Sequence, residues 1–126
     1  MFTLSVKRKF SAQHFLIGKD WGDESRAHLH KYGLVCTIDS DKLGPDDYIV
    51  DVARIERILD EIIGEYRDKT LNDLPDFENN NPSMEFFCKV LCDRISGYLT
   101  GQGIMSLTVR LSESDTAEAS YKRKCG

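Results

Sequence analysis

The sequence lacks any apolar run of the roughly 18 to 20 residues that a membrane-spanning helix requires. It also lacks an excess of positive charge, because 17 Lys and Arg stand against 21 Asp and Glu and give a net charge of −4. We therefore expect neither a membrane nor a nucleic acid as partner. The basic residues near the N-terminus follow a short alternating stretch instead of preceding an apolar one, so we expect no signal peptide and a cytoplasmic location.

Cysteine is scarce, and its pattern excludes a disulfide framework. Cys36, Cys88, Cys92 and Cys125 form no Cys-x-x-Cys pair, which predicts reduced thiols. Hydrophobic residues make up 40% and charged residues 30% of the 126, a balance typical of a globular protein. We predict a single domain over residues 1–126. A domain of this size buries only about 65% of its unfolded surface, which favours oligomerisation.

Hydrophobic periodicity predicts an α+β fold with two helices on one face of a sheet. Period-2 alternation predicts strands at residues 2–14, 28–38 and 105–113, and we expect a short fourth strand at residues 117–122. Apolar residues recurring at three and four predict two helices between the second and third strands. The first spans residues 52–66 with Asp51 as N-cap, and the second begins with Asn81 as N-cap and Pro82 as its first helical residue.

The three histidines lie where they could share a metal ion. His28 and His30 are on the same face of a predicted strand, about 7 Å apart along it. His14 ends the first strand in phase with the apolar residues Phe10 and Ala12. Three neutral imidazoles leave Zn²⁺ its full charge and one open coordination position. The residues alone also allow an alternative without metal, in which the His28-x-His30 pair is a coincidence and His14 is a histidine of the core.

Six short motifs, in order, carry a resemblance that covers nearly the whole chain. They are Phe10-Ser11-Ala12-Gln13-His14, His28-Leu29-His30, Ile49-Val50-Asp51, Thr70-Leu71-Asn72-Asp73, Asn81-Pro82-Ser83-Met84-Glu85 and Leu111-Ser112-Glu113-Ser114. In this order and spacing the chain resembles the 6-pyruvoyl-tetrahydropterin synthase and 6-carboxy-tetrahydropterin synthase family.

The resemblance implies the tunnelling fold, an antiparallel four-stranded sheet with two helices on one face. In this family trimers close a barrel, two trimers stack as a hexamer, and active sites lie between subunits. The resemblance also implies Zn²⁺ bound by His14, His28 and His30, with Leu29 in place of the usual glycine.

The same resemblance implies a pterin or related purine-derived substrate. Glu113 matches the glutamate that anchors the pterin, and a carboxylate can accept the ring's amino group and ring NH together. Ser83, Met84 and Glu85 match the segment that frames the ring. From the residues alone, Glu113 would be interpreted as a surface acid at a strand end. Glu85 could equally be a first-turn helix acid.

The sequence departs from the family at its proton-transfer residues. The usual cysteine before the His-x-His motif is Glu24, and the usual Asp-His pair becomes Arg67-Asp68 or retains only Asp68. One subgroup also has glutamate for this cysteine and cleaves the side chain of 7,8-dihydroneopterin triphosphate to 6-hydroxymethyl-7,8-dihydropterin. Without the resemblance, Glu24 is one more loop acid, and Arg67-Asp68 a polar helix end.

Three functions are compatible with this residue set. The first is a zinc-dependent lyase in which Glu24 is the base, Asp68 assists proton transfer and Glu113 holds the ring. The second is a pterin- or purine-binding protein without the family's chemistry. The third is a zinc-stabilised oligomeric scaffold.

Overall fold

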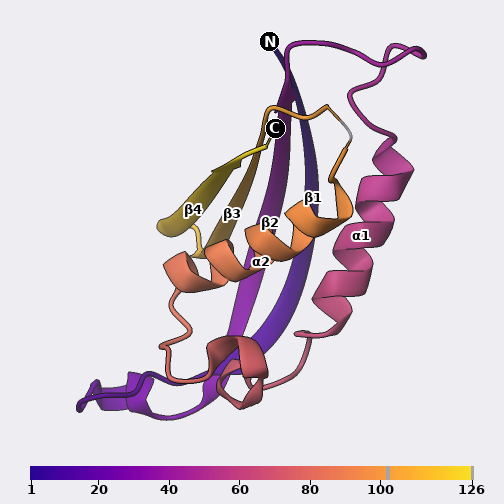
Figure 1. Ribbon diagram of the computed structural model, residues 1–126. Helices are drawn as coiled ribbons and strands as arrows, with labels where there is room; N and C mark the ends of the chain where they lie inside the picture. The colour runs from indigo at the N-terminus through magenta and orange to yellow at the C-terminus, as the bar shows by residue number, and fades with distance from the viewer. Residues whose placement is uncertain (102, 126) are drawn as a thin grey trace.

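A four-stranded antiparallel sheet with two helices on one face forms the fold, and the strand order is β1-β2-β3-β4 (Figure 1). The computed structural model describes residues 1–101 and 103–125. The strands are β1 (Phe2–His14), β2 (His28–Ser40), β3 (Ser106–Ser114) and β4 (Ala117–Lys124), and the helices are α1 (Val52–Gly64) and α2 (Met84–Tyr98). The predicted α+β layout is confirmed. No helix among the described residues is long and apolar enough to cross a membrane.

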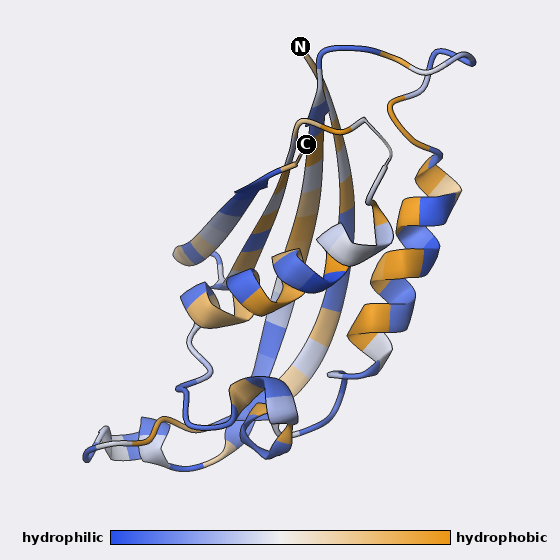
Figure 2. Ribbon diagram, viewed as in Figure 1, coloured by the Kyte–Doolittle hydropathy of each residue, from blue (hydrophilic) through white to orange (hydrophobic). Residues whose placement is uncertain are grey.

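Alternation places one face of the sheet under the helices, as Figure 2 shows by the alternating colours along the strands. The helix α1 packs beside β1, and α2 packs across β3 and β4. The buried layer between them is apolar. It includes Phe10 and Ala12 of β1, Leu34 and Cys36 of β2, and Val109 of β3.

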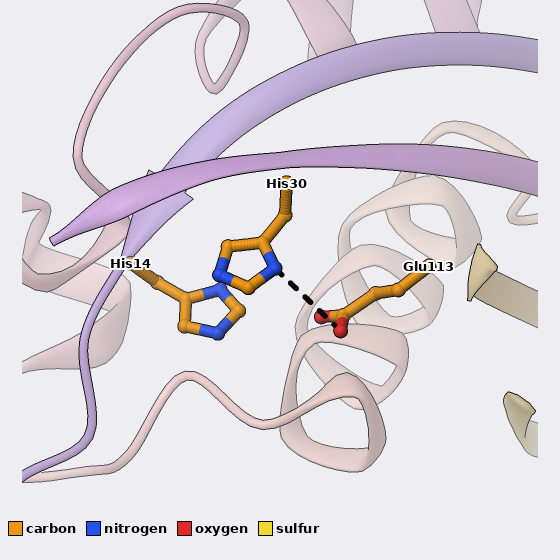
Figure 3. Close-up of side chains that lie close together, drawn as sticks. All are labelled: His14, His30 and Glu113. Carbon is orange, nitrogen blue, oxygen red and sulfur yellow. Dashed lines mark ion pairs between the residues drawn. The ribbon is translucent and has the colours of Figure 1, made fainter. Parts of the chain in front are cut away.

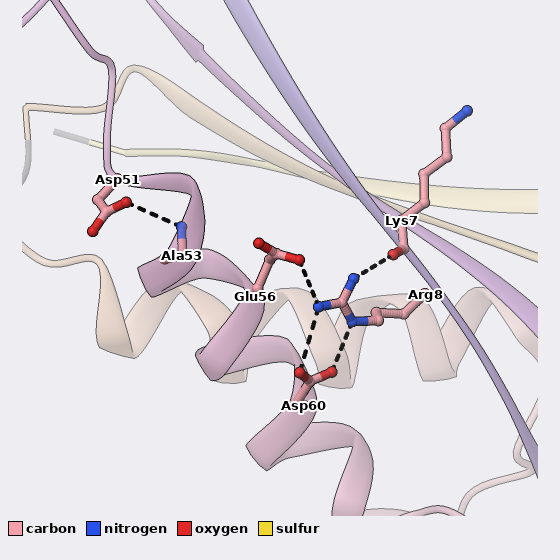
Figure 4. A network of polar contacts seen from close by, with 6 residues as sticks. All are labelled: Lys7, Arg8, Asp51, Ala53, Glu56 and Asp60. Carbon is pink, nitrogen blue, oxygen red and sulfur yellow. Dashed lines mark hydrogen bonds and ion pairs between the residues drawn. The ribbon is translucent and has the colours of Figure 1, made fainter.

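Arg8 interrupts the apolar alternation of β1 because it pairs with α1. Its Nε donates to Asp60 at 2.7 Å, and its Nη2 donates to Glu56 at 3.0 Å (Figure 4). This pairing lowers the pKa of the Asp60 carboxyl. A charged residue on the helix-covered face is therefore accommodated by two carboxylates one turn apart on the same helix.

The first helix begins as predicted and the second does not. Asp51 is the N-cap of α1, and its carboxylate accepts the Ala53 N–H at 3.1 Å (Figure 4). For α2, Asn81 as N-cap and Pro82 as first helical residue are wrong. Ser83 is the N-cap, with its hydroxyl accepting the Phe86 N–H at 3.1 Å.

The other element ends differ from the predicted ones by a few residues. The helix α1 ends at Gly64, two residues earlier than predicted, and β4 extends to Lys124. The charged connection after β1 contains a short 3₁₀ helix, η1 (Gly22–Ser25). Two further 3₁₀ turns, η2 (Leu71–Asp73) and η3 (Pro75–Phe77), connect α1 to α2.

Phe87 lies at the centre of the aromatic core, and its loss is expected to be costly. Its fully buried ring makes edge-to-face contacts with Tyr32 and Phe77, each at 5.4 Å between centroids. Phe87→Ala should lower the free energy of unfolding by about 3–5 kcal/mol in urea titrations. The exposed Phe2→Ala is the matched control. A loss below about 1 kcal/mol for Phe87→Ala would contradict this packing.

Candidate metal centre

The histidines gather at the end of the sheet where β1 and β2 extend past β3. His14 is the cross-strand partner of His28, whereas β2 and β3 pair only as far as Gly33 and Ser112. Glu113 follows at once, where β3 separates from β2. Figure 3 shows His14 and His30 with their rings together and Glu113 directed at His30. The structure thus brings the predicted histidines to one place.

Two overlapping sets of side chains could hold a metal ion, and His30 belongs to both. One set is His14, His30 and Glu113, and the other is Glu24, His28 and His30. Within each set, one ligand atom per residue lies within 4.8 Å of the others. The rings of His14 and His30 stack at 3.7 Å between centroids, and His28 and His30 are 4.6 Å apart.

One hydrogen bond and one ion-pair contact indicate which ring nitrogen His28 and His30 leave free. Nδ1 of His28 is 2.8 Å from the Arg26 carbonyl oxygen, which can only accept, so Nδ1 carries the proton. Nδ1 of His30 faces the Glu113 carboxylate at 3.6 Å, and a carboxylate again favours the proton on Nδ1. Nε2 of His30 is buried and has no hydrogen-bond partner. Both histidines therefore present an Nε2 lone pair.

The charges around these nitrogens suit a divalent cation. Oε1 of Glu24 is 3.3 Å from Nε2 of His28, so two acceptors face each other unless a proton or a cation lies between them. Burial, and then the proximity of His30, lowers the pKa of His14 to about 4 and keeps that imidazole neutral at physiological pH. Neutral imidazoles beside carboxylates form a donor set that binds Zn²⁺. The buried, unpartnered Nε2 of His30 is the observation that shows this fit.

A cavity of about 460 Å³ opens beside Glu113. The residues that line it include Lys9, Lys31, Tyr32 and Ser112. Glu113 is partly buried and is among the residues that line this cavity, and its carboxylate lies 3.6 Å from Nδ1 of His30.

The helix-start residues matched to pterin binding have structural contacts in the single chain. The Ser83 hydroxyl is engaged as the cap of α2, and Met84 is partly buried against the core. Glu85 is exposed in the first turn of the helix. No contact described for these residues reaches the histidines, and their role toward a ligand stays a prediction.

Arg67 and Asp68 lie beside the outer edge of β1, which residues 68–70 cover near Ser11 and Gln13, and not in the histidine cluster of the same chain. Both side chains are exposed. The Asp68 N–H donates to the Ser11 carbonyl at 2.7 Å, and Asp68 has a left-handed φ of 60°. This hydrogen bond fixes Asp68 against β1 at Ser11, which precedes His14 by three residues.

Two asparagines of the sequence motifs hold the segment that follows His14, a role that sequence reasoning missed. The Asn72 amide accepts the Phe15 N–H at 3.0 Å and donates to the Phe15 carbonyl at 2.9 Å. Asn81 makes the same pair with Ile17, at 2.7 and 3.2 Å. Between them, the Leu16 N–H donates to the Glu24 carbonyl at 2.6 Å. The clamped segment therefore fixes the backbone of Glu24 as well as that of His14.

No buried thiol of this chain can take the role of the cysteine that typical relatives have at the position of Glu24. Cys36, Cys88 and Cys92 are buried in the core, and burial raises their pKa values to about 12, 11 and 11. Thiols with such pKa values stay protonated at neutral pH.

An antiparallel sheet covered on one face by two helices, with a histidine and carboxylate cluster at its end, defines an α+β protein with a candidate metal centre. The family model for 6-pyruvoyl tetrahydropterin synthase matches residues 3–124. The chain therefore belongs to the 6-pyruvoyl tetrahydropterin synthase family.

Individual relatives agree with this assignment. The 6-carboxy-5,6,7,8-tetrahydropterin synthase of Bacillus subtilis is 28% identical over 102 residues, 78% of this chain and 68% of the relative. The 6-pyruvoyl tetrahydropterin synthase of Caenorhabditis elegans superposes with a TM-score of 0.82 at 16% identity, covering 98% and 96% of the two chains. A Plasmodium vivax 6-pyruvoyltetrahydropterin synthase with a catalytic glutamate replaced by alanine gives 0.75 at 15% identity, covering 98% of both chains. These superpositions confirm the predicted tunnelling fold.

Proposed function

We propose that this protein is a zinc-dependent lyase that acts on the side chain of 7,8-dihydroneopterin triphosphate or a closely related pterin. Membership of the family supports pterin chemistry in general. The buried, unpartnered Nε2 of His30, a residue that shares one candidate ligand set with His14 and Glu113 and another with Glu24 and His28, is the observation that carries the zinc-dependent part.

His14, His28 and His30 are the proposed metal ligands, and Glu24 is the proposed base. Bound zinc supplies a Lewis acid that polarises a side-chain hydroxyl of the substrate. Glu24 lies beside His28 with its side chain 47% exposed, so its carboxylate can reach a substrate that enters from solvent. In the P. vivax relative, too, a glutamate is named as the catalytic residue. A carboxylate in this place can take the proton that a cysteine takes in typical members.

Glu113 is the proposed anchor of the pterin ring. Glu113 is among the residues that line the cavity of about 460 Å³, and an amino group and a ring NH of the pterin are proposed to donate to its two carboxylate oxygens. Ser83, Met84 and Glu85 are proposed to frame the ring, and we assign them to the site through the oligomer, since their own chain's histidines are not in contact with them.

A homotrimer, or a dimer of trimers, is proposed to complete the site. Strands β1 and β4 are the two edges of the described sheet, and residues 68–70 cover the β1 edge only near Ser11 and Gln13. The preceding part of β1 in one chain can therefore pair with β4 of the next and close a barrel. The antiparallel order puts the end of β1 at the same end of the sheet as Glu113. Asp68, held beside the outer edge of β1, would then lie near the neighbouring chain's anchor and assist proton transfer there.

Incubation of the zinc-loaded protein with 7,8-dihydroneopterin triphosphate tests the proposal. We expect one of two outcomes, either a two-carbon fragment together with 6-hydroxymethyl-7,8-dihydropterin, or released triphosphate. Chromatography of the reaction mixture detects these products. Neither product appearing with fully zinc-loaded protein would contradict the proposed reaction.

Glu113→Gln is expected to weaken pterin binding while the bound metal is retained. A charged hydrogen-bond acceptor contributes about 1.5–3 kcal/mol, which corresponds to roughly 10–100-fold in the dissociation constant of neopterin. Calorimetric titration of the zinc-loaded variants with neopterin measures this dissociation constant. The matched control is Glu118→Gln, since Glu118 is an exposed glutamate on β4 that pairs with Arg110 on β3. Equal affinities of the two variants would argue against Glu113 as the anchor.

A binding protein without turnover is the second candidate. The observation that favours it is the protonated, buried state of Cys36, Cys88 and Cys92, which leaves Glu24 without the thiol of typical members. This candidate predicts tight pterin binding and no product under the conditions above.

A further inference from the structure

Gly33 leaves a hollow on the face of the sheet opposite the helices. It lies in β2 between the buried residues Tyr32 and Leu34, so a side chain at its position would point away from the helices. A Cβ there would lie 2.8 Å from Oγ of Ser112, closer than two such atoms normally approach. The Ser112 hydroxyl therefore takes part of the space that the glycine leaves open. Both residues line the cavity of about 460 Å³.

Two lysines border this hollow on the same face of the sheet. Lys9 of β1 and Ser112 of β3 are the cross-strand partners of Gly33, and Lys31 precedes Gly33 by two residues on β2. Neighbouring strands are about 4.8 Å apart and alternate residues of one strand about 7 Å, so the three side chains surround Gly33. Lys9 and Lys31 are exposed, and both line the cavity.

Neither lysine is neutralised within its own chain. Among residues 1–101 and 103–125, no carboxylate forms an ion pair with Lys9 or Lys31. Arg110, by contrast, is paired with Glu118 at 3.4 Å on the same face. Lys9 and Lys31 are diagonal neighbours on two paired strands, where long side chains come within reach of each other. Two like charges so placed repel each other, and an anion bound between them removes the repulsion.

The acidic residues of the cavity come from another part of the sheet. Glu113 lies near the end of β3, and Asp115 follows in the turn to β4. The carboxylate of Glu113 is 3.6 Å from Nδ1 of His30 and makes no ion pair with either lysine. The cavity is therefore bordered by basic residues from β1 and β2 and by acidic residues from the far end of β3. This arrangement suits a ligand that carries both hydrogen-bond donors and an anionic group.

We propose that Lys9, Lys31 and the Ser112 hydroxyl form a phosphate-binding subsite over Gly33. Lysine binds phosphate as a point charge, and the hydroxyl adds a directional donor. Two ammonium groups match the nearly doubly negative charge of a phosphate ester better than the single charge of a carboxylate. The phosphate comes either from a phosphorylated pterin whose ring Glu113 holds, a source that rests on the proposed function, or from a free polyphosphate.

Calorimetric titration with sodium tripolyphosphate tests the subsite itself. Lys9→Gln and Lys31→Gln each remove one charge, and we expect each to raise the dissociation constant about 5–10-fold, since both lysines are exposed. Lys7→Gln is the matched control, because Lys7 is on the same face of β1 and does not line the cavity. Dissociation constants of the three variants within about twofold of one another would overturn the proposal, as would wild-type protein that binds no tripolyphosphate.

Gly33→Ala tests the hollow without any change of charge. Gly33 lies in a regular strand and has no left-handed φ, so alanine is compatible with its backbone. Its Cβ would displace the Ser112 hydroxyl and fill the space over the strand. We expect tripolyphosphate to bind several-fold more weakly while the circular dichroism spectrum is retained. A folded Gly33→Ala variant with wild-type affinity would overturn the placement of the phosphate over Gly33.

Neopterin and neopterin triphosphate distinguish the two sources, because they share the ring and differ only in the phosphates. If the phosphate of a bound pterin occupies the subsite, Lys9→Gln weakens neopterin triphosphate about 5–10-fold and leaves neopterin unchanged. If a free polyphosphate occupies it, Lys9→Gln weakens tripolyphosphate alone. Failure of the proposed function gives a different result, with no pterin binding and no turnover, while a tripolyphosphate affinity that depends on Lys9 and Lys31 would still establish the subsite.

Discussion

Replacing His30 by alanine is expected to abolish stoichiometric metal binding. His30 is the residue shared by both candidate ligand sets, and its Nε2 is buried without a partner. Its ring also lies beside those of both other histidines, at 3.7 Å from His14 and 4.6 Å from His28 between centroids. The affinity for Zn²⁺ should therefore fall by more than the roughly 10–100-fold that loss of an outer partner causes. Elemental analysis and chelator competition on purified protein measure this.

Lys31→Ala provides the control for His30→Ala, because it alters the next residue of the same strand on the other face. Circular dichroism and urea unfolding of both metal-free variants establish that the sheet is intact. A folded His30→Ala variant that retains one zinc per chain at wild-type affinity would remove His30 from the metal centre.

Replacing Glu24 by glutamine is expected to lower turnover by about 10²- to 10⁴-fold, the usual contribution of a general base. The substitution keeps the size of the side chain and removes its ability to take a proton. The Leu16 N–H bonds the backbone of Glu24, so the loop should keep its course. Steady-state turnover of 7,8-dihydroneopterin triphosphate, measured at full zinc occupancy, gives the result.

Asp23→Asn is the matched control for Glu24→Gln, since Asp23 is the adjacent acid of the same 3₁₀ helix. Turnover lost in Glu24→Gln and kept in Asp23→Asn would exclude the binding protein without chemistry. Equal turnover of Glu24→Gln and the wild-type protein would show that another group is the base.

The fold was largely predictable because one face of β1, β2 and β3 is buried. Alternation located these three strands, since slipping any of them by one residue would turn its apolar set to solvent. The start of α2 was not predictable from local signals. Asn81 and Pro82 have the residue types of a helix start, but the Asn81 amide bonds the backbone of Ile17, 64 positions away. Arg8 likewise breaks the pattern of β1 because of carboxylates on α1.

The proximity of the histidines was predictable, and the groups that orient them were not. The His28-x-His30 spacing puts two rings on one strand face, and the phase of β1 puts His14 on the same side. Tyr32 reads in the sequence as one more apolar residue of β2, and its bond to His14 depends on the pairing of β1 with β2. Asn72 and Asn81 act through the backbone of a segment about 60 positions away, which no local pattern encodes.

The measurement that tests the central claim most directly is the metal content and metal coordination of the purified protein. Elemental analysis combined with X-ray absorption should find one zinc per chain, with imidazole nitrogens at about 2.0–2.1 Å. Clean protein with no bound transition metal after exposure to zinc, or a zinc ion without imidazole ligands, would contradict the account.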